Sequence, residues 1–556
     1  MRYSFRLDSY GLTAGTLRFF KIKETVNQLL GEKLALNSKM DYGTLVEAMI
    51  LRLCKSSYRG LWSTRSFDTM PLELLLATNV KSTDLDRFSL ASTLDAISNF
   101  GAVPLYLMVA SKVFKKLGLT VEEVHIDSTS FHYDGKTREE TACLLQARMG
   151  YSRDHRPDLN QFIELFMVEP NSGLPVFAKS LSGNISDKTS FFETASNELK
   201  LVQRQFQDLS FFVGDSAACT ANTFKAVTDS GLNIVTRPPD NLSTTKSCYN
   251  YAAKHKAEFV PLGVKGRNNH YSGLWVPNIT LFEYPVKALV LRNDSKRESV
   301  EATIRRNAAK EQARLTKAVK KLRTQPAKCE PDAQTNLRKL QKTCKLTTIK
   351  LDDVIKKYDS RGRPTADGEK KVKSVAFVTH VELDEQAIAD KIHDEMMFTL
   401  VTTDTKRNWD MVDLKGIYSR QSLVERDWRL AKDPRILLDA FFLNRPSRIN
   451  ALLWLVSISL LLMLALEYLA NERCREYIDQ IPQPDGSARK AGSKLSFIRM
   501  RDFFDEAGIT ILLFHQLGLV HVDGITEVHK GFLSALGPEW SQLYDPDHIR
   551  KAICPV

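Results

Sequence analysis

The sequence lacks the short motifs of common nucleotide-binding and zinc-binding proteins. It has no P-loop and no GxGxxG run, and its eight cysteines are scattered without a CxxC pair. Zinc ribbons need closely spaced cysteine pairs, and disulfide frameworks belong mainly to small secreted domains. The first residues also lack the apolar run of a secretory signal peptide. We therefore expect reduced thiols and a cytoplasmic protein.

Long apolar runs are scarce, and one of them approaches the length of a membrane span. Residues 451–466 carry no charge, and Glu467 ends the run. A membrane span needs about 20 apolar residues, whereas a helix that is apolar on all sides also suits the centre of a large α/β domain. We interpret the run as a buried core helix and expect no membrane partner. A membrane-associated protein built on this helix is the alternative.

Positive charge exceeds negative charge by a moderate margin. The 556 residues include 78 Lys or Arg against 66 Asp or Glu, which gives a net charge of +12. Such an excess favours a polyanionic partner such as nucleic acid. With 43% hydrophobic residues the chain can bury a sizeable core, and it is too long for one compact domain.

A single carboxylate lies within the largely apolar and β-branched run that follows Glu122 and Glu123, at residues 124–131. Because an unpaired charge in a buried strand is costly, Asp127 needs a compensating partner. Taken alone, this residue is best explained by a strand that ends in an aspartate capping the next turn. The other interpretation is a metal ligand at the edge of a strand, which requires carboxylate partners elsewhere in the chain.

Strands and helices alternate after residue 121. The pattern predicts three strands, a helix, a strand, a helix and a strand, at residues 124–127, 161–168, 174–179, 188–206, 209–215, 221–230 and 233–237. The turn at 169–173 is expected to join the second and third strands into a hairpin. This is the order of a ribonuclease-H-like core, in which the first and fourth strands are neighbours. Asp127 and Asp215 are therefore expected side by side.

A basic insertion interrupts this pattern. Residues 296–323 hold ten Lys or Arg against three Glu, and a second basic helix is expected at 336–345. We predict a basic helical hairpin. Its charge fits a solvated helix face and a DNA-contacting arm about equally well. A loop at 360–364 and a strand at 397–402, re-entering the core, follow.

A helix expected at 417–434 carries a third acid. At 100° per residue, five polar side chains fall close to one line on this helix: Tyr418, Gln421, Glu425, Arg429 and Lys432. An exposed, salt-bridged helix face would give the same pattern. Two strand-borne aspartates and one helix-borne glutamate can instead hold two Mg²⁺ or Mn²⁺ ions, since such hard cations prefer carboxylate oxygens. Tyr418 and Lys432 would then be placed to bind a phosphate of DNA.

Here the sequence resembles a known family, the DDE transposases of bacterial insertion sequences, in the broad IS4-like group and most closely its IS1634-type branch. The resemblance extends over most of the chain and includes residues 71–76, 94–96, 125–130, 150–158, 183–189, 215–217 and 536–538. Its most specific part is the signature Tyr-x2-Arg-x3-Glu-x6-Lys. This chain has Tyr418, Glu425 and Lys432 at that spacing but Gln421 where Arg is usual.

The resemblance implies a fold and an activity. The fold would be α/β, a ribonuclease-H-like catalytic core with a helical N-terminal domain and a large insertion before the last catalytic helix. Asp127, Asp215 and Glu425 would bind two Mg²⁺ (or Mn²⁺) ions per active site. The partners would be double-stranded DNA, as terminal inverted repeats and target, and a second copy of the chain. The DNA- or phosphate-binding residues would be Tyr418, Gln421, Arg429, Lys432 and Arg156.

Five segments follow from these expectations. They are a helical N-terminal domain at 1–120, a first part of the core at 121–239, an inserted subdomain at 240–394, a second part of the core at 395–475 and a C-terminal α-rich segment at 476–556. The substitution at Gln421 leaves one alternative function open. That alternative is a non-catalytic relic of a transposase, which binds element ends without cutting them.

Overall fold

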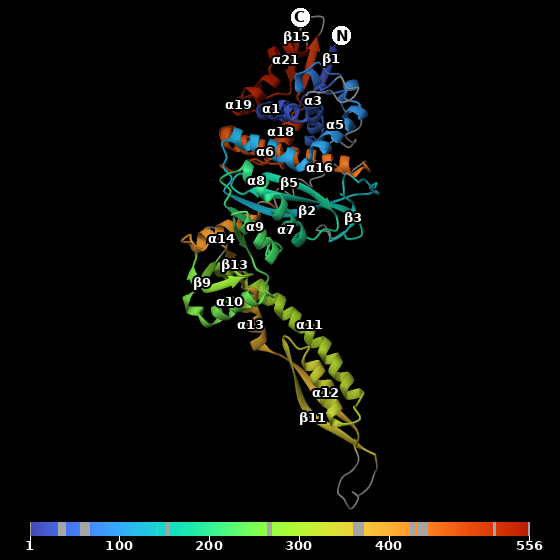
Figure 1. The fold of residues 1–556 in the computed structure, drawn as a ribbon, viewed down its shortest axis with the longest axis vertical. Coiled ribbons are helices and arrows are strands. Elements are labelled where there is room, and N and C mark those ends of the chain that lie inside the picture. Colours follow the sequence, from blue (N-terminus) through green and yellow to red (C-terminus); the bar gives the residue numbers. More distant parts are fainter. Residues whose placement is uncertain are drawn as a thin grey trace, which may run out of the picture. The chain divides into compact units, whose positions relative to one another are not determined.

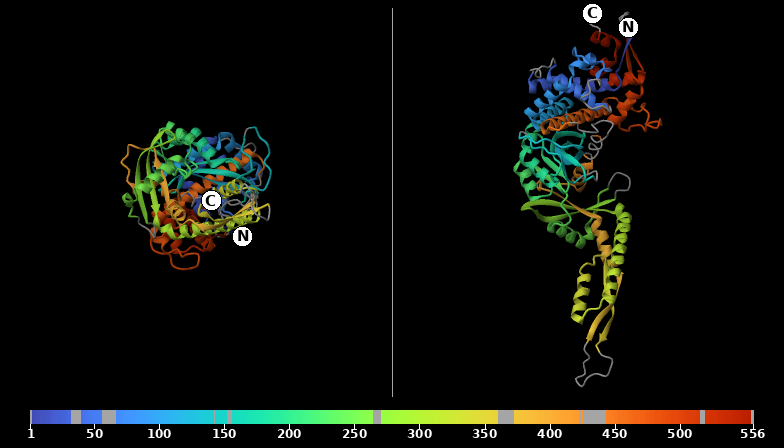
Figure 2. Two further views of the ribbon diagram at one scale, coloured as in Figure 1. Left: turned by 90° about the horizontal axis from the view of Figure 1, so that it is seen from below. Right: turned by 90° about the vertical axis from the view of Figure 1, so that its right-hand side faces the viewer.

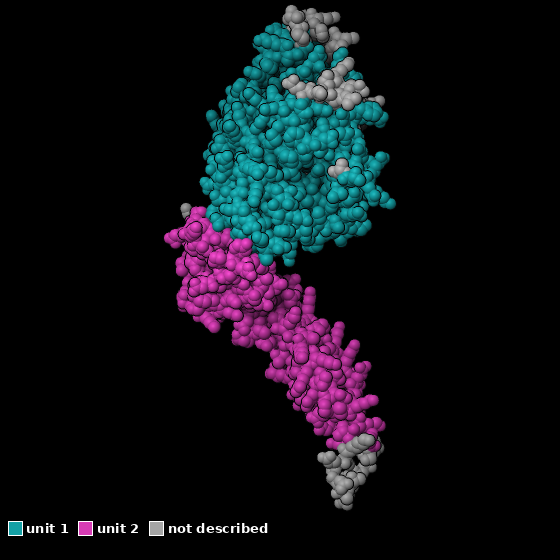
Figure 3. Space-filling model, viewed as in Figure 1, with its two compact units in different colours: residues 1–236, 416–556 teal, residues 237–415 magenta. Residues whose placement is uncertain are grey.

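The computed structural model divides the chain into two compact units. It describes all residues except 1, 32–39, 56–66, 142, 152–155, 264–269, 360–371, 423, 425–429, 431–442, 515–518 and 554–556. The first unit comprises residues 1–236 and 416–556, and the second comprises residues 237–415 (Figure 3). The loop expected at 360–364 lies outside the described residues. Overall the chain is a mixed α/β protein.

A mixed sheet lies at the centre of the first unit. Its strands are β2 (Glu123–His132), β3 (Arg148–Met149), β4 (Asn160–Glu169), β5 (Leu174–Ser182), β6 (Phe211–Gly214) and β7 (Asn233–Thr236). The order is β5-β4-β2-β6-β7, with the short β3 also paired to β4. β4 is antiparallel to β2 and β5, whereas β6 is parallel to β2 and to β7. All five strands predicted between residues 121 and 239 are therefore present.

The β4–β5 hairpin forms where the turn residues predict it. The Glu169 carboxylate accepts hydrogen bonds from the backbone N–H groups of Asn171 and Ser172, at 2.8 and 2.7 Å. Gly173 then adopts a φ of 73°, in the left-handed region that glycine enters at little cost. Local turn chemistry thus sets the register of this hairpin.

Helices cover both faces of this sheet. α6 (Ala102–Leu117) and α16 (Pro446–Arg473) pack on β5, and Figure 1 shows them on the same side of the sheet, with α7 (Asp187–Asn197) and α9 (Ala221–Asp229) on the other side. α8 (Leu199–Gln205) continues from α7, so the helix predicted at 188–206 is broken in two. The hydroxyls of Ser186 and Thr220 cap the first turns of α7 and α9.

The apolar run at 451–466 forms the middle of α16. This helix is long and apolar enough to cross a membrane, but 94% of its most apolar stretch is buried inside the unit. It packs against α3 (Tyr42–Cys54), α5 (Arg87–Phe100), α6 and β5, and the right-hand view in Figure 2 shows it, in orange, crossing the interior. The interpretation of this run as a core helix is confirmed.

The two ends of the chain share one layer of the first unit. β1 (Arg2–Arg6) pairs with β14 (Thr510–Phe514), which pairs with β15 (Leu519–Asp523). The Trp540 ring is buried against α1 (Tyr10–Phe20), and its Nε1 donates to the carbonyl of Leu12 at 3.1 Å. The sequence pattern did not indicate these strands. Within its described residues this unit also contains the helices α2 (Ile22–Leu30), α4 (Leu72–Leu75), α17 (Arg475–Ile478), α18 (Phe497–Glu506), α19 (Glu527–Leu536), α20 (Pro538–Ser541) and α21 (Pro546–Ile553).

The second unit contains an antiparallel sheet and a helical pair. The sheet order is β13-β10-β9-β8, with β8 (Val260–Pro261), β9 (Tyr271–Leu281), β10 (Tyr284–Asn293) and β13 (Met397–Thr402). The strand predicted at 397–402 is therefore present. In the sequence, α10 (Ser243–Lys254) precedes β8 and α13 (Glu385–Glu395) directly precedes β13.

The predicted helices are also present, as α11 (Arg297–Thr324) and α12 (Glu330–Gln341). α11 is basic as predicted, whereas α12 begins six residues before the predicted start and is not basic, because its acids balance its bases. Both helices pack on a two-stranded sheet that the sequence pattern did not indicate, β11 (Thr347–Tyr358) with β12 (Val372–Leu383). Apolar side chains from both helices and both strands form a small core, which contains Leu315, Val319, Ala333, Leu337, Ile349, Val375, Phe377 and Val381. Figure 1 shows α11 running along this hairpin.

Candidate active site

The parallel pairing of β2 with β6 brings Asp127 and Asp215 together. The last register pair of the two strands is Ile126 with Gly214, and the next residue of each chain segment is an aspartate. Neighbouring strands lie about 4.8 Å apart. The two aspartates therefore lie on neighbouring chain segments where β6 ends, although 88 residues separate them in the sequence.

Backbone N–H groups hold the side chains of both aspartates in place. Asp127 Oδ1 accepts the N–H of Ser128 at 2.7 Å, and Asp215 Oδ1 accepts the N–H of Ala217 at 2.9 Å. The carbonyl oxygen of Asp215 also accepts the Thr236 hydroxyl of β7, at 2.7 Å. Gly214 permits this arrangement, because a Cβ there would lie 2.6 Å from the Ala218 methyl group. These contacts orient the carboxylates and leave both residues half-buried.

Gln421 is hydrogen-bonded to β2, the strand that carries Asp127. Its Nε2 donates to the carbonyl of Ile126 at 2.8 Å, and its Oε1 lies 2.9 Å from His125 Nδ1. Since a carboxamide oxygen only accepts hydrogen bonds, His125 must carry a proton on Nδ1. The amide of Gln421 therefore uses its acceptor and one donor on β2. The second N–H of the amide is not used in these contacts.

Arg420 makes a second connection to the same strand. Its Nε and Nη2 lie 2.7 and 2.6 Å from Glu123 Oε1, and His125 Nε2 lies 3.5 Å from the same oxygen. Burial would raise the pKa of Glu123, but its contacts with His125 and with the charged Arg420 outweigh that effect and lower the pKa. Glu123 is therefore ionised at neutral pH and holds the Arg420 side chain.

The other residues predicted for the site are placed less closely. Tyr418 is half-buried in the last turn of α14 (Met411–Ser419). Arg156 is exposed, and its guanidinium makes a two-pronged ion pair with Asp158, at 2.9 and 2.8 Å. Three predicted site residues, Glu425, Arg429 and Lys432, lie outside the described residues.

Among the described residues, no three His, Cys, Asp or Glu side chains are grouped closely enough to hold a metal ion. Asp187 is a further acid in contact with this region, because Ser128 Oγ donates to its Oδ1 at 2.7 Å. It does not complete a group of three with Asp127 and Asp215. The described part of the candidate site is thus a pair of adjacent carboxylates.

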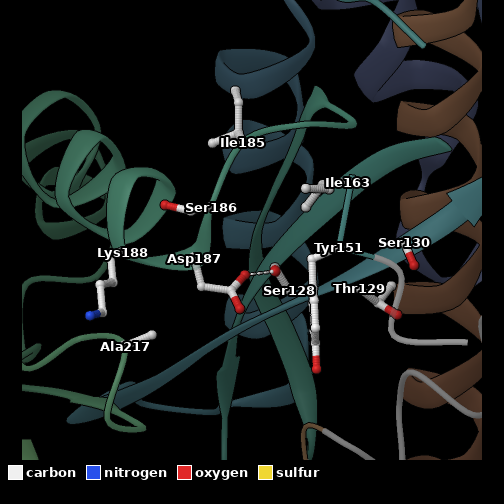
Figure 4. A pocket seen from close by; sticks show the side chains of 10 residues that line it. All are labelled: Ser128, Thr129, Ser130, Tyr151, Ile163, Ile185, Ser186, Asp187, Lys188 and Ala217. Carbon is white, nitrogen blue, oxygen red and sulfur yellow. Dashed lines mark hydrogen bonds between the residues drawn. The ribbon is translucent and has the colours of Figure 1, made fainter. Parts of the chain in front are cut away.

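A cavity of ≈ 260 Å³ opens beside this pair. Ser128 and Ala217, which follow the two aspartates in the chain, lie on its wall together with Thr129, Ser130, Tyr151, Ile163, Ile185, Ser186, Asp187 and Lys188. Figure 4 shows Asp187 reaching Ser128 from the start of α7, with Lys188 beside it. We assigned no role to Asp187 or Lys188 from the sequence, although both lie in the stretch 183–189 that carries part of the family resemblance.

Comparisons with known proteins cover part of the chain. Residues 3–111 match the family model described as "Domain of unknown function (DUF4277)", a stretch that ends before Asp127. No curated protein matches the chain significantly. Among solved structures, the chain is similar to the cryo-EM structure of a piggyBac transposase synaptic complex with hairpin DNA. The identity is 10%, the similarity covers 89% of this chain and 79% of that chain, and the TM-score is 0.36. A TM-score this low does not establish a common fold.

Proposed function

We propose that the chain is a DDE-type DNA transposase, which binds the terminal inverted repeats of an insertion sequence and catalyses cleavage and transfer of DNA strands. The family matched by residues 3–111 is associated with transposases. The observation that carries the proposal is the parallel pairing of β2 with β6, since it makes Asp127 and Asp215 neighbours. The motifs around both residues resemble those of the family.

The strand order supports a ribonuclease-H-like core. In the order β5-β4-β2-β6-β7, β4 alone runs against the other strands. β2 continues to His132, so Asp127 lies within the strand and not at the end predicted for it, whereas Asp215 directly follows β6. The first and fourth strands in sequence thus carry the two acids, as in such a core.

The contacts of Gln421 support Glu425 as the third acid. Gln421 is hydrogen-bonded to the strand residues directly before Asp127. Glu425 follows it by four residues in the sequence, and four residues of chain span at most about 14 Å. We therefore propose Glu425 as the third acid on its spacing from Gln421 in the family signature. Gln421 thereby acquires a positioning role in the proposal, besides its second N–H for a phosphate.

The donor set fits two Mg²⁺ (or Mn²⁺) ions, held by Asp127, Asp215 and Glu425. Carboxylate oxygens are the ligands these cations prefer, and the half-burial of both aspartates leaves room for water and phosphate. When bound, two such ions supply activation of the attacking oxygen and stabilisation of the leaving oxygen. Tyr418, Arg429, Lys432 and Arg156 are the proposed phosphate contacts, and they would fix the register of the DNA. The proposed assembly on DNA is a homodimer, and the location is cytoplasmic.

The test is strand cleavage in Mn²⁺ on a duplex that carries the DNA bordering the gene. We expect Asp127→Asn, Asp215→Asn and Glu425→Gln each to abolish the cleaved product while a gel shift persists. Asp208→Asn, an exposed aspartate before β6, is the matched control and should cut like the wild type. Cleavage at the wild-type rate by any of the three variants would refute the triad. A wild-type protein that shifts the duplex and yields no product would be the non-catalytic relic.

A further inference from the structure

We infer that one exposed face of α11 binds the phosphate backbone of a DNA duplex. This inference rests on the proposed function, because it concerns the DNA on which a transposase acts. The surface consists of six exposed side chains, here called the basic stripe: Arg306, Lys310, Arg314, Lys317, Lys320 and Lys321. It lies wholly within the second unit.

Helix geometry places the basic stripe on a single face. At 100° per residue the six side chains fall within an arc of about 120°, and from Arg306 to Lys321 they extend over about 22 Å of helix. The buried side chains of α11 are Ile304, Ala308, Leu315 and Val319, which lie on the opposite side of the helix. The basic stripe therefore faces away from the core that holds α11 in place.

The acids of α11 form no ion pair with the basic stripe, although Glu311 is near enough to Arg314 to interact with its charge. Glu301 is paired with Arg305, which lies outside the stripe. Glu311 Oε1 accepts the N–H groups of Lys345 and Leu346 and the Thr347 hydroxyl, at 2.8, 3.0 and 2.7 Å. Among the described residues, no acid forms an ion pair with any of the six side chains. The stripe is thus a continuous band of positive charge.

This charge pattern differs from that of an ordinary solvated helix. Solvated helices gain about 0.2–0.5 kcal/mol from each pair of opposite charges four residues apart, and lose a similar amount from each pair of like charges. The basic stripe contains three like-charged pairs at this spacing, 306 with 310, 310 with 314, and 317 with 321. The arrangement costs stability in the isolated chain, and a polyanion would offset that cost. This observation favours DNA over the solvated-face interpretation.

The basic stripe also has a rigid support. α11 packs on α12 and on the β11–β12 hairpin through the apolar core around Leu315, Val319 and Phe377, and Figures 1 and 2 show the helix lying along that hairpin. Duplex DNA carries one charge for about every 1.7 Å of its axis, so 22 Å of helix can meet several phosphates. Contacts to phosphates position the DNA without reading its sequence. We therefore expect the basic stripe to bind duplexes of any sequence.

The experiment compares two triple variants of the full chain with equal changes of charge. Lys310→Gln, Lys317→Gln and Lys320→Gln remove half of the basic stripe. Lys246→Gln, Lys254→Gln and Lys256→Gln remove three exposed lysines in and beside α10, in the same unit. The probe is a 40-base-pair duplex of arbitrary sequence, and its dissociation constant is measured between 0.05 and 0.3 M salt. Thermal unfolding is measured on both variants, and we expect the stripe variant to be at least as stable as the wild type.

We expect the stripe variant to bind about 100-fold more weakly at 0.15 M salt, with a log–log salt slope lower by about 3, because each phosphate contact contributes about 0.9 to that slope. The α10 variant should lose far less affinity and keep its slope. Equal losses in the two variants, or an unchanged stripe variant, would overturn the inference. Cleavage by the wild type in Mn²⁺ is scored separately. If the wild type does not cleave DNA while the stripe variant still binds it about 100-fold more weakly, the result counts against the proposed function and leaves this inference standing.

Discussion

Glu164 offers a direct test of how the interior of the first unit is built. It lies on β4 opposite Thr129, fully buried, and accepts the Ser457 hydroxyl of α16 at 3.0 Å. Burial raises the pKa of this carboxyl from its ordinary value of 4.5 to about 8, while the hydroxyls of Ser180 and Ser457 lower it in part. The side chain is therefore neutral in the folded protein at pH 7.

The sign of the pH dependence follows from where the proton is bound. Between pH 4.5 and 8 the folded chain keeps a proton on Glu164 that the unfolded chain has released. Unfolding then releases a proton, so the free energy of unfolding falls as the pH rises through this window. Each pH unit within it costs about 1.4 kcal/mol. Between pH 5.5 and 8.5 the loss amounts to about 3 kcal/mol.

The variant Glu164→Gln should lack this loss, because an amide stays neutral and can still accept the Ser457 hydroxyl. For a unit of about 380 residues, 3 kcal/mol corresponds to roughly 4 °C in Tm. Thermal unfolding followed by circular dichroism at pH 5.5 and 8.5 should thus show the variant gaining about that much over the wild type. Glu47, whose pKa burial also raises to about 8, contributes equally to both proteins.

Glu298→Gln, at an exposed position of α11, controls for the loss of one carboxylate and should follow the wild type at both pH values. If the Tm of Glu164→Gln and that of the wild type changed in parallel between the two pH values, Glu164 would not be held neutral by burial. The account of the β4–α16 contact would then be wrong.

Three further predictions concern the site and its supports. Gln421→Arg introduces the residue that is usual in the family signature. It should lower the free energy of unfolding in urea by about 1–3 kcal/mol, because arginine cannot accept the hydrogen bond from His125. An unchanged free energy of unfolding would contradict the contact of Gln421 with β2. Glu123→Gln should lower the free energy of unfolding at pH 7. It should also reduce the loss of that free energy below about pH 4.5, since a carboxyl with a lowered pKa stabilises the fold above that pH and loses this effect as the pH falls. A loss as steep as that of the wild type would argue against the ion pair of Glu123 with Arg420. Gly183→Ala should lower the free energy of unfolding by about 1–3 kcal/mol or more, because the new Cβ would overlap the carbonyl oxygens of Gln161 and Arg148. Gly416→Ala has open space around the new Cβ and should be neutral or slightly stabilising. Equal melting temperatures for the two variants would refute the packing argument.

Local patterns in the sequence determined much of this protein. Short apolar runs predicted β2, β4, β5 and β6, and the turn chemistry of residues 169–173 predicted the hairpin, because strand composition and turn geometry depend on near neighbours. The apolar run predicted α16 as a core helix, and the charge run predicted α11. The order of these elements further led to the expectation that Asp127 and Asp215 lie side by side, and the β2–β6 pairing shows that they do.

The tertiary structure decided the contacts between residues far apart in the chain. β1 finds its partner β14 some 500 residues away, and no local pattern specifies such a pairing. In the same way, the helix pattern set Gln421 on a polar face with other site residues, but only the fold shows its amide bound to His125 and Ile126. The meeting of Asp187 with Ser128 is of the same kind. Sequence thus determined which elements form and which acids they carry, whereas packing decided which side chains those acids meet, since that depends on surfaces that exist only once the elements are assembled.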